Sequence, residues 1–258
     1  MNYIGIDIGS TCAKTVVLNE KKEIIQEFVQ PTGWSSVDTA EEIRQKLELN
    51  GINLSEDSSH CVATGYGRIS VPYADKTVTE ITCHALGAVH LFQQPDLTVI
   101  DIGGQDTKII QIEQGFVKDF IMNDKCAAGT GRFLEVMANT LSLRPNEMFD
   151  LARLGSDTTI SSMCTVFAES EVIGLIGKGE PKENIAYAVV NSTIRKVAAQ
   201  VSRMNGEMST FCLTGGLCEC DYIREALSKE LGNEVISCPD ARYAGAIGAA
   251  LSAMKIQR

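Results

Sequence analysis

The chain has 258 residues, 44% hydrophobic and 22% charged, a composition typical of a globular protein with one large or two modest cores. Its net charge of −10 disfavours nucleic acid or an anionic membrane surface as the main partner, because like charges repel. The start lacks a cationic segment before an apolar core, and no apolar run approaches the ~18 residues of a membrane helix. With nine cysteines and no secretion signal, we expect a soluble cytoplasmic protein with reduced thiols.

The first elements in the chain form a unit that is repeated later. Residues 4–18 (IGIDIGSTCAKTVVL) can be laid over residues 99–112 (VIDIGGQDTKIIQI) at an offset of 94. Each copy predicts a strand, a glycine turn, a second strand, a short polar turn and a third strand, which together form an antiparallel meander. The matched positions are Asp7 with Asp101, Gly9 with Gly103, and Lys14 with Lys108.

Strands and helices alternate in the rest of the chain, which predicts α/β layers rather than a sandwich. We expect helices over residues 37–49, 80–92, 131–143, 166–178 and 182–205, strands at 60–63 and 211–214 that run into glycine turns, and a short strand and helix within 236–251. The last helix is rich in Gly and Ala and can pack closely against a neighbour. We assign residues 1–92 plus 243–258 to one half and residues 93–242 to the other.

The repeated glycine turns are candidate phosphate sites, because such turns expose successive backbone N–H groups. One turn from each half would grip a triphosphate from both sides. Asp7 and Asp101 lie two residues before the turns. A carboxylate beside phosphates is repulsive unless a divalent cation lies between them, so we assign both to the water shell of Mg2+. A single Asp-x-Gly is an ordinary strand-to-turn junction, and the matched copy favours the nucleotide interpretation.

A third glycine turn, LTGGL at 213–217, suits a flat adenine and ribose approaching the backbone closely, although a plain tight turn is the alternative. Gln105, in the second turn, is our candidate for orienting the attacking water, and capping of the turn is its alternative role. Asp7, Asp101 and Gln105 are therefore the expected catalytic residues. The expected nucleotide-binding residues are Gly9, Ser10, Thr11, Lys14, Gly103, Gly104, Gln105, Gly215 and Gly216.

Two cysteines each precede a helix-like segment, Cys126 in NDKCAAGTGRFLE and Cys164 in SSMCTVFAESEVIGLIG. A helix N-terminus stabilises a thiolate and would favour a negatively charged iron–sulfur cluster. Two cysteines cannot complete a shell of four thiolates, but two copies in a symmetric dimer can. The spacing alone is a weak signal, because lone cysteines are more often small core residues.

The glycines that follow the first of these cysteines resemble another phosphate loop, which would be redundant beside the two repeated turns. We therefore expect Gly129 and Gly131 to let the backbone approach a cluster or a second chain closely. We also expect the start of the helix at Arg132 to donate N–H groups to cluster sulfides.

The motifs GIDIGST, DIGGQDTK, LTGG and AGAIGAAL resemble those of the ATPases that include sugar and acetate kinases, heat-shock chaperones and actin. This resemblance implies two ribonuclease-H-like halves around an interdomain ATP cleft. NDKCAAGTGRFLEVMA and SSMCTVFAESEVI, with ATGYGR and CHALGA, are very similar to motifs of the activator components of 2-hydroxyacyl-CoA dehydratases, which in turn resemble ATPase subunits of benzoyl-CoA reductases.

That resemblance implies a homodimer with one 4Fe-4S cluster, ligated by Cys126 and Cys164 of both subunits. It also implies a ferredoxin or flavodoxin as electron donor, and a dehydratase or reductase as the partner that receives the electron. ATP with Mg2+, hydrolysed to ADP, would drive the transfer.

Two other classes share the ATP motifs. A small-molecule kinase of the acetyl-sugar type would need a general base near the γ-phosphate and no cluster. An ATP-dependent chaperone or filament would lack both redox chemistry and a phosphorylated product.

The remaining candidate residues favour structural roles. Cys218 and Cys220 could bind a metal, but no second pair has metal-site spacing. Cys12 is more typical of a small space-filling residue, and His84 is more typical of a hydrogen-bonded structural histidine.

Overall fold

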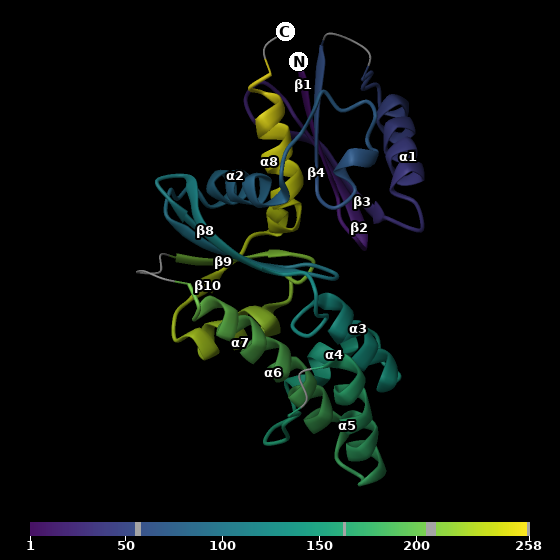
Figure 1. The fold of residues 1–258 in the computed structure, drawn as a ribbon, viewed down its shortest axis with the longest axis vertical. Coiled ribbons are helices and arrows are strands. Elements are labelled where there is room, and N and C mark those ends of the chain that lie inside the picture. The colour runs from purple at the N-terminus through teal and green to yellow at the C-terminus, as the bar shows by residue number, and fades with distance from the viewer. Residues whose placement is uncertain (55–57, 162–163, 205–209, 257–258) are drawn as a thin grey trace. The chain divides into compact units, whose positions relative to one another are not determined.

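The computed structural model describes residues 1–54, 58–161, 164–204 and 210–256. Its fold is mixed α/β and contains two five-stranded sheets (Figure 1). The chain divides into two compact units. The first unit comprises Met1–Leu97, Ile110–Lys118 and Asp240–Arg258, and the second comprises Thr98–Ile109 and Asp119–Pro239.

The first sheet has the strand order β3-β2-β1-β4-β5. The β1–β2 and β2–β3 pairs are antiparallel, as the meander predicts, whereas β4 pairs in parallel with both β1 and β5. Its strands are β1 (Asn2–Ile8), β2 (Cys12–Leu18), β3 (Ile24–Pro31), β4 (Ser59–Thr64) and β5 (Lys76–Thr77).

Helices cover both faces of this sheet, which is why its central strand β1 is apolar along most of its length. The Ile4, Ile6 and Ile8 side chains of β1 pack in one core with residues of helix α1 (Ser36–Leu49). On the opposite face a second core contains residues of β2 and of helix α8 (Ala244–Ala253). A short 3-10 helix, Arg68–Ser70, follows β4.

Helix α2 (Glu80–Phe92) packs against α8, and glycines permit the close approach (Figure 1). A Cβ atom on Gly87 would overlap the backbone carbonyl of Ala244, and one on Gly248 would overlap that of Cys83. The close packing predicted for the Gly- and Ala-rich helix is confirmed, and neither position leaves room for a side chain.

The second sheet has the strand order β10-β9-β6-β7-β8. Its strands are β6 (Leu97–Ile102), β7 (Thr107–Glu113), β8 (Phe116–Asn123), β9 (Thr210–Gly215) and β10 (Val235–Ile236). β6 is buried throughout, whereas the edge strand β8 is largely exposed. The three strands of the second meander therefore lie side by side, as the repeat predicts.

The helices of the second unit gather around α6, which packs against α3, α4, α5 and α7. They are α3 (Gly131–Thr140), α4 (Pro145–Ala152), α5 (Thr165–Gly177), α6 (Lys182–Val201) and α7 (Asp221–Leu231). In Figure 1, α6 and α7 lie on the same side of β9 and β10. A 3-10 helix, Pro239–Tyr243, leads into α8.

Most predicted elements are confirmed, with two helices missed and two that end early. We did not predict α4, which starts at a proline with a capping box, or α7, which ends at Gly232 in the left-handed region. α3 stops at Thr140 rather than residue 143, because Ser142 adopts a φ of 54°. α6 ends at Val201, and the predicted end at Asn205 lies outside the described residues. Within the described ranges, no helix is long and apolar enough to cross a membrane.

Candidate functional site

The two repeated turns have the same backbone hydrogen bonding. The N–H of Gly9 donates to the carbonyl of Cys12 (3.1 Å), and the N–H of Gly103 donates to the carbonyl of Asp106 (2.9 Å). Gln105 is exposed at the tip of the second turn, as are Ser10 and Thr11 in the first. The two turns, related by the offset of 94 residues in the sequence, therefore have matching backbone hydrogen bonds.

Thr32 braces the first turn and was not singled out in the sequence. Its hydroxyl donates to the carbonyl of Gly9 (2.7 Å), and its N–H donates to the carbonyl of Thr11 (2.9 Å). Thr32 is buried just after β3, so only the folded sheet brings it to the turn. The carbonyls of Gly9 and Thr11 are thereby engaged, which favours N–H groups as the part of the turn that faces a ligand.

The two matched aspartates are buried in matched surroundings. Asp7 is 6% exposed and Asp101 is 2% exposed. Each lies against a glycine with a φ of 84°, Gly65 just after β4 and Gly215 at the end of β9, where an added Cβ would collide with the aspartate Oδ1. Both glycines follow a threonine. The duplication thus extends to the Thr-Gly pairs that end β4 and β9, a correspondence we did not detect in the sequence.

The charges around the two aspartates differ. The Thr214 hydroxyl donates to Asp101 Oδ1 (2.9 Å), and the buried Lys108 ammonium lies 3.4 Å from Asp101 Oδ2 and 2.8 Å from Asp106 Oδ2. Near Asp7 lies the imidazole of His84, whose Nε2 is 3.9 Å from Asp7 Oδ2, too far for a hydrogen bond. A fixed positive charge therefore accompanies Asp101.

Lys14, the counterpart of Lys108, does not reproduce that pairing. It stands opposite Asp7 in the β1–β2 ladder and is half-buried, and no ion pair is recorded for it among the described residues. His84, expected to be structural, is buried beside Asp7 and close to Gly245 of α8. The carboxylate of Asp7 suits the water shell of a divalent cation better than that of Asp101, because Lys108 already compensates the latter.

The third turn begins where β9 ends. Gly216 is exposed, and a Cβ there would meet nothing within 4 Å, so a flat ligand could approach its backbone. Cys218 is buried and Cys220 caps the N-terminus of α7, where burial raises the pKa of its thiol. Across the parts of the chain that the structure describes, no group of three or more His, Cys, Asp or Glu side chains is arranged for a metal ion.

The backbone of the loop that carries Cys126 is fixed by side-chain hydrogen bonds and by a glycine. The Asn123 amide donates to the carbonyls of Cys126 (2.8 Å) and Ala128 (3.1 Å). Gly129 adopts a φ of 84°, which a residue with a side chain rarely takes up. The loop is thus shaped by contacts to its backbone, and Cys126 itself is exposed.

Hydrogen bonds tie this loop to the second glycine turn. The N–H of Gly131 donates to the carbonyl of Gly103 (2.9 Å), and the N–H of Arg132 donates to that of Gly104 (2.8 Å). The Thr107 hydroxyl donates to the carbonyl of Gly129 (2.6 Å). Our expectation that the start of this helix donates N–H groups to cluster sulfides is therefore wrong for the amides of Gly131 and Arg132, which the turn carbonyls engage. A helix N-terminus leaves its first N–H groups without intrahelical acceptors, and the turn carbonyls supply them.

Cys164 is the N-cap residue of α5, and its side chain makes no capping hydrogen bond. It is exposed at a helix N-terminus, as predicted, where a thiolate is favoured. The following helix exposes apolar side chains: Val166 and Phe167 are each 67% exposed, and Ile173 is 57% exposed. We call this surface of α5 the apolar face. The thiol of Cys164 is an exposed sulfur donor, which fits a cluster ligand that a second protein surface would cover.

The two sheets, the duplicated turns and the buried aspartates define an ATPase of the actin-like class, and the predicted fold class is confirmed. The model of the BadF/BadG/BcrA/BcrD ATPase family matches residues 4–253. The chain belongs to that family.

Similar proteins extend over nearly the full length. The chain is 44% identical over 257 residues to the (R)-2-hydroxyglutaryl-CoA dehydratase activating ATPase of Acidaminococcus fermentans, covering 98% of this chain and 96% of that protein. The crystal structure of component A of that organism's dehydratase superposes with a TM-score of 0.91 at 41% identity, covering 99% of this chain and 98% of the other. A 2-hydroxyisocaproyl-CoA dehydratase activator from Clostridium difficile, with bound ADPNP, gives 0.87 at 34% identity over 100% and 99% of the two chains. These relatives are dehydratase activators, which disfavours the kinase alternative.

Proposed function

We propose that this protein is an ATP-hydrolysing iron–sulfur activator that passes a low-potential electron to a partner 2-hydroxyacyl-CoA dehydratase or a related reductase. Near-full-length similarity to dehydratase activators supports the partner class. The observation that carries the coupling is the pair of hydrogen bonds from the start of α3 to the second glycine turn, because it joins a phosphate-site candidate to the Cys126 loop.

In this proposal ATP and Mg2+ use the repeated turns. The exposed N–H groups of both turns bind phosphate oxygens, and the turn at Gly215 and Gly216 takes the adenosine. Asp7 and Asp101 lie in the water shell of Mg2+. Asp7 contributes more to binding the cation, because the charge of Asp101 is already paired with Lys108. The remaining contacts are assigned to Ser10, Thr11, Lys14, Gly103 and Gly104, and the positioning of the attacking water to Gln105.

The cluster assignment rests on Cys126 and Cys164 from each of two copies. A 4Fe-4S cluster held by these thiolates would supply one-electron chemistry at low potential. The apolar face of α5 supports a homodimer, because pairing across a two-fold axis would bury it. Gly174 and Gly177 are also exposed there, with nothing within 4 Å of an added Cβ, and would allow two helices to approach. We propose a ferredoxin or flavodoxin as donor and the reducing cytoplasm as the location.

The coupling follows from the backbone contacts. Displacement of the Gly103–Gly104 turn on nucleotide binding would shift its carbonyls, and the amides of Gly131 and Arg132 would move with them. Cys126 lies only a few residues upstream, so its thiolate would move as well. Nucleotide can shift such an equilibrium only by binding its two states unequally, and a near-complete switch needs about 5.5 kcal/mol.

Anaerobic purification tests the assignment. The protein should be brown, dimeric and carry about four irons per dimer. Cys126→Ser and Cys164→Ser should each lose the iron and the colour, whereas Cys220→Ser serves as the matched control and should keep both. Full iron content in either serine variant would remove the proposed ligands. Iron-free protein that phosphorylates a small molecule would point to the kinase alternative instead.

A further inference from the structure

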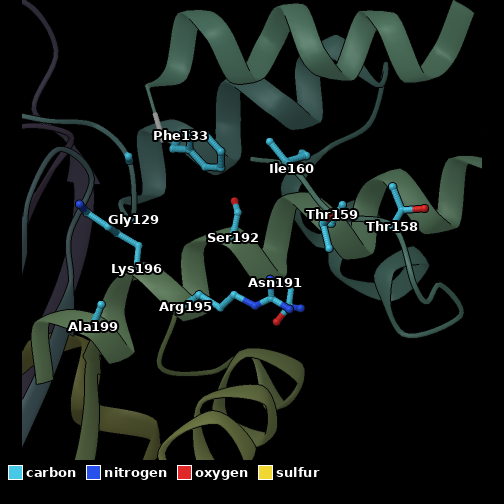
Figure 2. A pocket seen from close by; sticks show the side chains of 12 residues that line it. Gly129, Phe133, Thr158, Thr159, Ile160, Asn191, Ser192, Arg195, Lys196 and Ala199 are labelled. Carbon is cyan, nitrogen blue, oxygen red and sulfur yellow. The ribbon is translucent and has the colours of Figure 1, made fainter. Parts of the chain in front are cut away.

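We infer that a cavity in the second unit, separate from the glycine turns, binds a small organic anion. The cavity has a volume of about 210 Å³ and lies between α6, Phe133 of α3 and residues 158–160 (Figure 2). None of the residues at the three glycine turns lines it. The lining does include Gly129, three residues after Cys126, and Ile160, four residues before Cys164.

The cavity has an apolar body. Phe133 and Ile160 face it from the side opposite α6 (Figure 2). Ala188, which belongs to α6, also lines it. Phe133 is 2% exposed and Ala188 is 2% exposed, so these walls belong to the packed core. A ligand here would bury a short apolar group, which is favourable by about 25 cal/mol per Å² of apolar surface.

Two cations stand at the edges of the cavity. Lys196 extends toward Gly129 at one end, and Arg195 runs beside Asn191 along the other side of α6 (Figure 2). Neither Arg195 nor Lys196 has a recorded ion pair or hydrogen bond within the described ranges. Arg195 is exposed and Lys196 is half-buried, so solvent reaches both cations. An anionic group in the cavity would pair with them, and Arg suits carboxylate or phosphate geometry.

One acid lies near the lining but is already engaged. Glu180 accepts hydrogen bonds from Thr158 (2.5 Å) and Asn184 (2.9 Å), and these bonds lower the pKa of its carboxyl. Glu180 does not line the cavity. Its charge is therefore held by Thr158, which lines the cavity, and by Asn184, which does not, rather than by the two cations.

A buried amide adds an independent indication at the Lys196 end. Gln200 is 3% exposed, and neither its Oε1 nor its Nε2 has a hydrogen-bond partner in the described structure. Its Nε2 lies 4.0 Å from the position of a Cβ on Gly129, and Lys196 packs against the same glycine. Gln200 does not itself line the cavity. Buried polar groups are rarely left unsatisfied, so its amide is an unmet hydrogen-bonding group beside the Lys196 end.

The size of the cavity limits the ligand. Its volume corresponds to about seven water molecules at ~30 Å³ each. This suits a small acid with a short apolar body, either a carboxylate or a phosphate monoester, and not a coenzyme. Such an occupant would touch both segments that lead to the exposed cysteines.

Calorimetric titration of the anaerobic protein tests the inference, with benzoate and phenyl phosphate as probes and benzyl alcohol as the neutral analogue. MgADP is kept saturating so that the nucleotide site is filled. At least one anionic probe should bind once per chain and at least tenfold more tightly than benzyl alcohol. The probe that binds better separates a carboxylate ligand from a phosphate ester.

The variant Arg195→Gln/Lys196→Gln should weaken that probe at least tenfold and leave MgADP affinity unchanged. Lys178→Gln, an exposed lysine outside the cavity, is the matched control and should bind like the wild type. Ser192→Leu, which fills the cavity without changing its charge, should also abolish binding. Circular dichroism establishes that each variant is folded. The inference is overturned if neither anion binds the wild type, if both cavity variants bind normally, or if the probe competes with MgADP. Iron content does not enter the readout, so failure here is distinguishable from failure of the proposed function.

Discussion

Replacement of Lys108 by Met tests whether the buried charges at the second turn form one compensated group. The Lys108 and Asp101 side chains are 4% and 3% exposed, and Asp106 is 23% exposed. Removing one partner of a buried ion pair typically costs about 3–5 kcal/mol, because the remaining charge stays desolvated. We expect Lys108→Met to cost about 3 kcal/mol, the lower end, because water reaches Asp106. That is a change of more than about a hundredfold in the folding equilibrium.

The assay is urea denaturation followed by far-UV circular dichroism. Lys118→Met is the matched control, because Lys118 pairs with Glu113 at 3.0 Å with side chains 45% and 56% exposed, and such surface pairs contribute about 0–1 kcal/mol. The double variant Asp101→Asn/Lys108→Met should recover about 1 kcal/mol of the loss, since it removes the stranded charge. A Lys108→Met cost no larger than that of the control, or a double variant no more stable than the single one, would refute the reasoning.

Three further predictions follow from the duplicated and close-packed regions. Thr214→Val should lower the free energy of unfolding by about 1.5–3 kcal/mol, because the Thr214 hydroxyl donates to a buried carboxylate. Thr64→Val should lower it by less than about 1 kcal/mol, because the Thr64 hydroxyl has no such acceptor. Equal losses in urea denaturation would contradict this difference between the two threonines. Gly248→Ala should lower stability by at least about 1–3 kcal/mol, because the methyl group would overlap a backbone carbonyl of α2, and an unchanged melting temperature would count against that crossing. Burial raises the pKa of the Cys83 thiol to about 12, so at pH 9 this thiol remains protonated and should resist iodoacetamide. The exposed Cys126 of cluster-free protein should react under the same conditions. Labelling of both cysteines, detected by mass spectrometry, would contradict the burial of Cys83.

Local patterns in the sequence were sufficient to predict most strands and helices and the repetition of the meander. Alternating apolar residues, glycine turns and matched spacing located the strands of both meanders, and these signals act over a few residues. The same signals placed Cys164 at the start of α5 and predicted the close packing of α8. α4 and α7 were missed although the proline at the start of α4 and the glycine at the end of α7 were legible in the sequence.

The partners of the functional residues became apparent only in the folded chain, where distant segments pack together. The sequence matched Lys14 with Lys108, yet only Lys108 lies in an ion pair with a buried aspartate. It suggested that N–H groups at the start of the helix at Arg132 face a cluster, yet the Arg132 amide donates to the carbonyl of Gly104 in the second glycine turn. Hydrogen bonds and ion pairs depend on which distant segments packing brings within about 3–4 Å, and no local pattern encodes that distance.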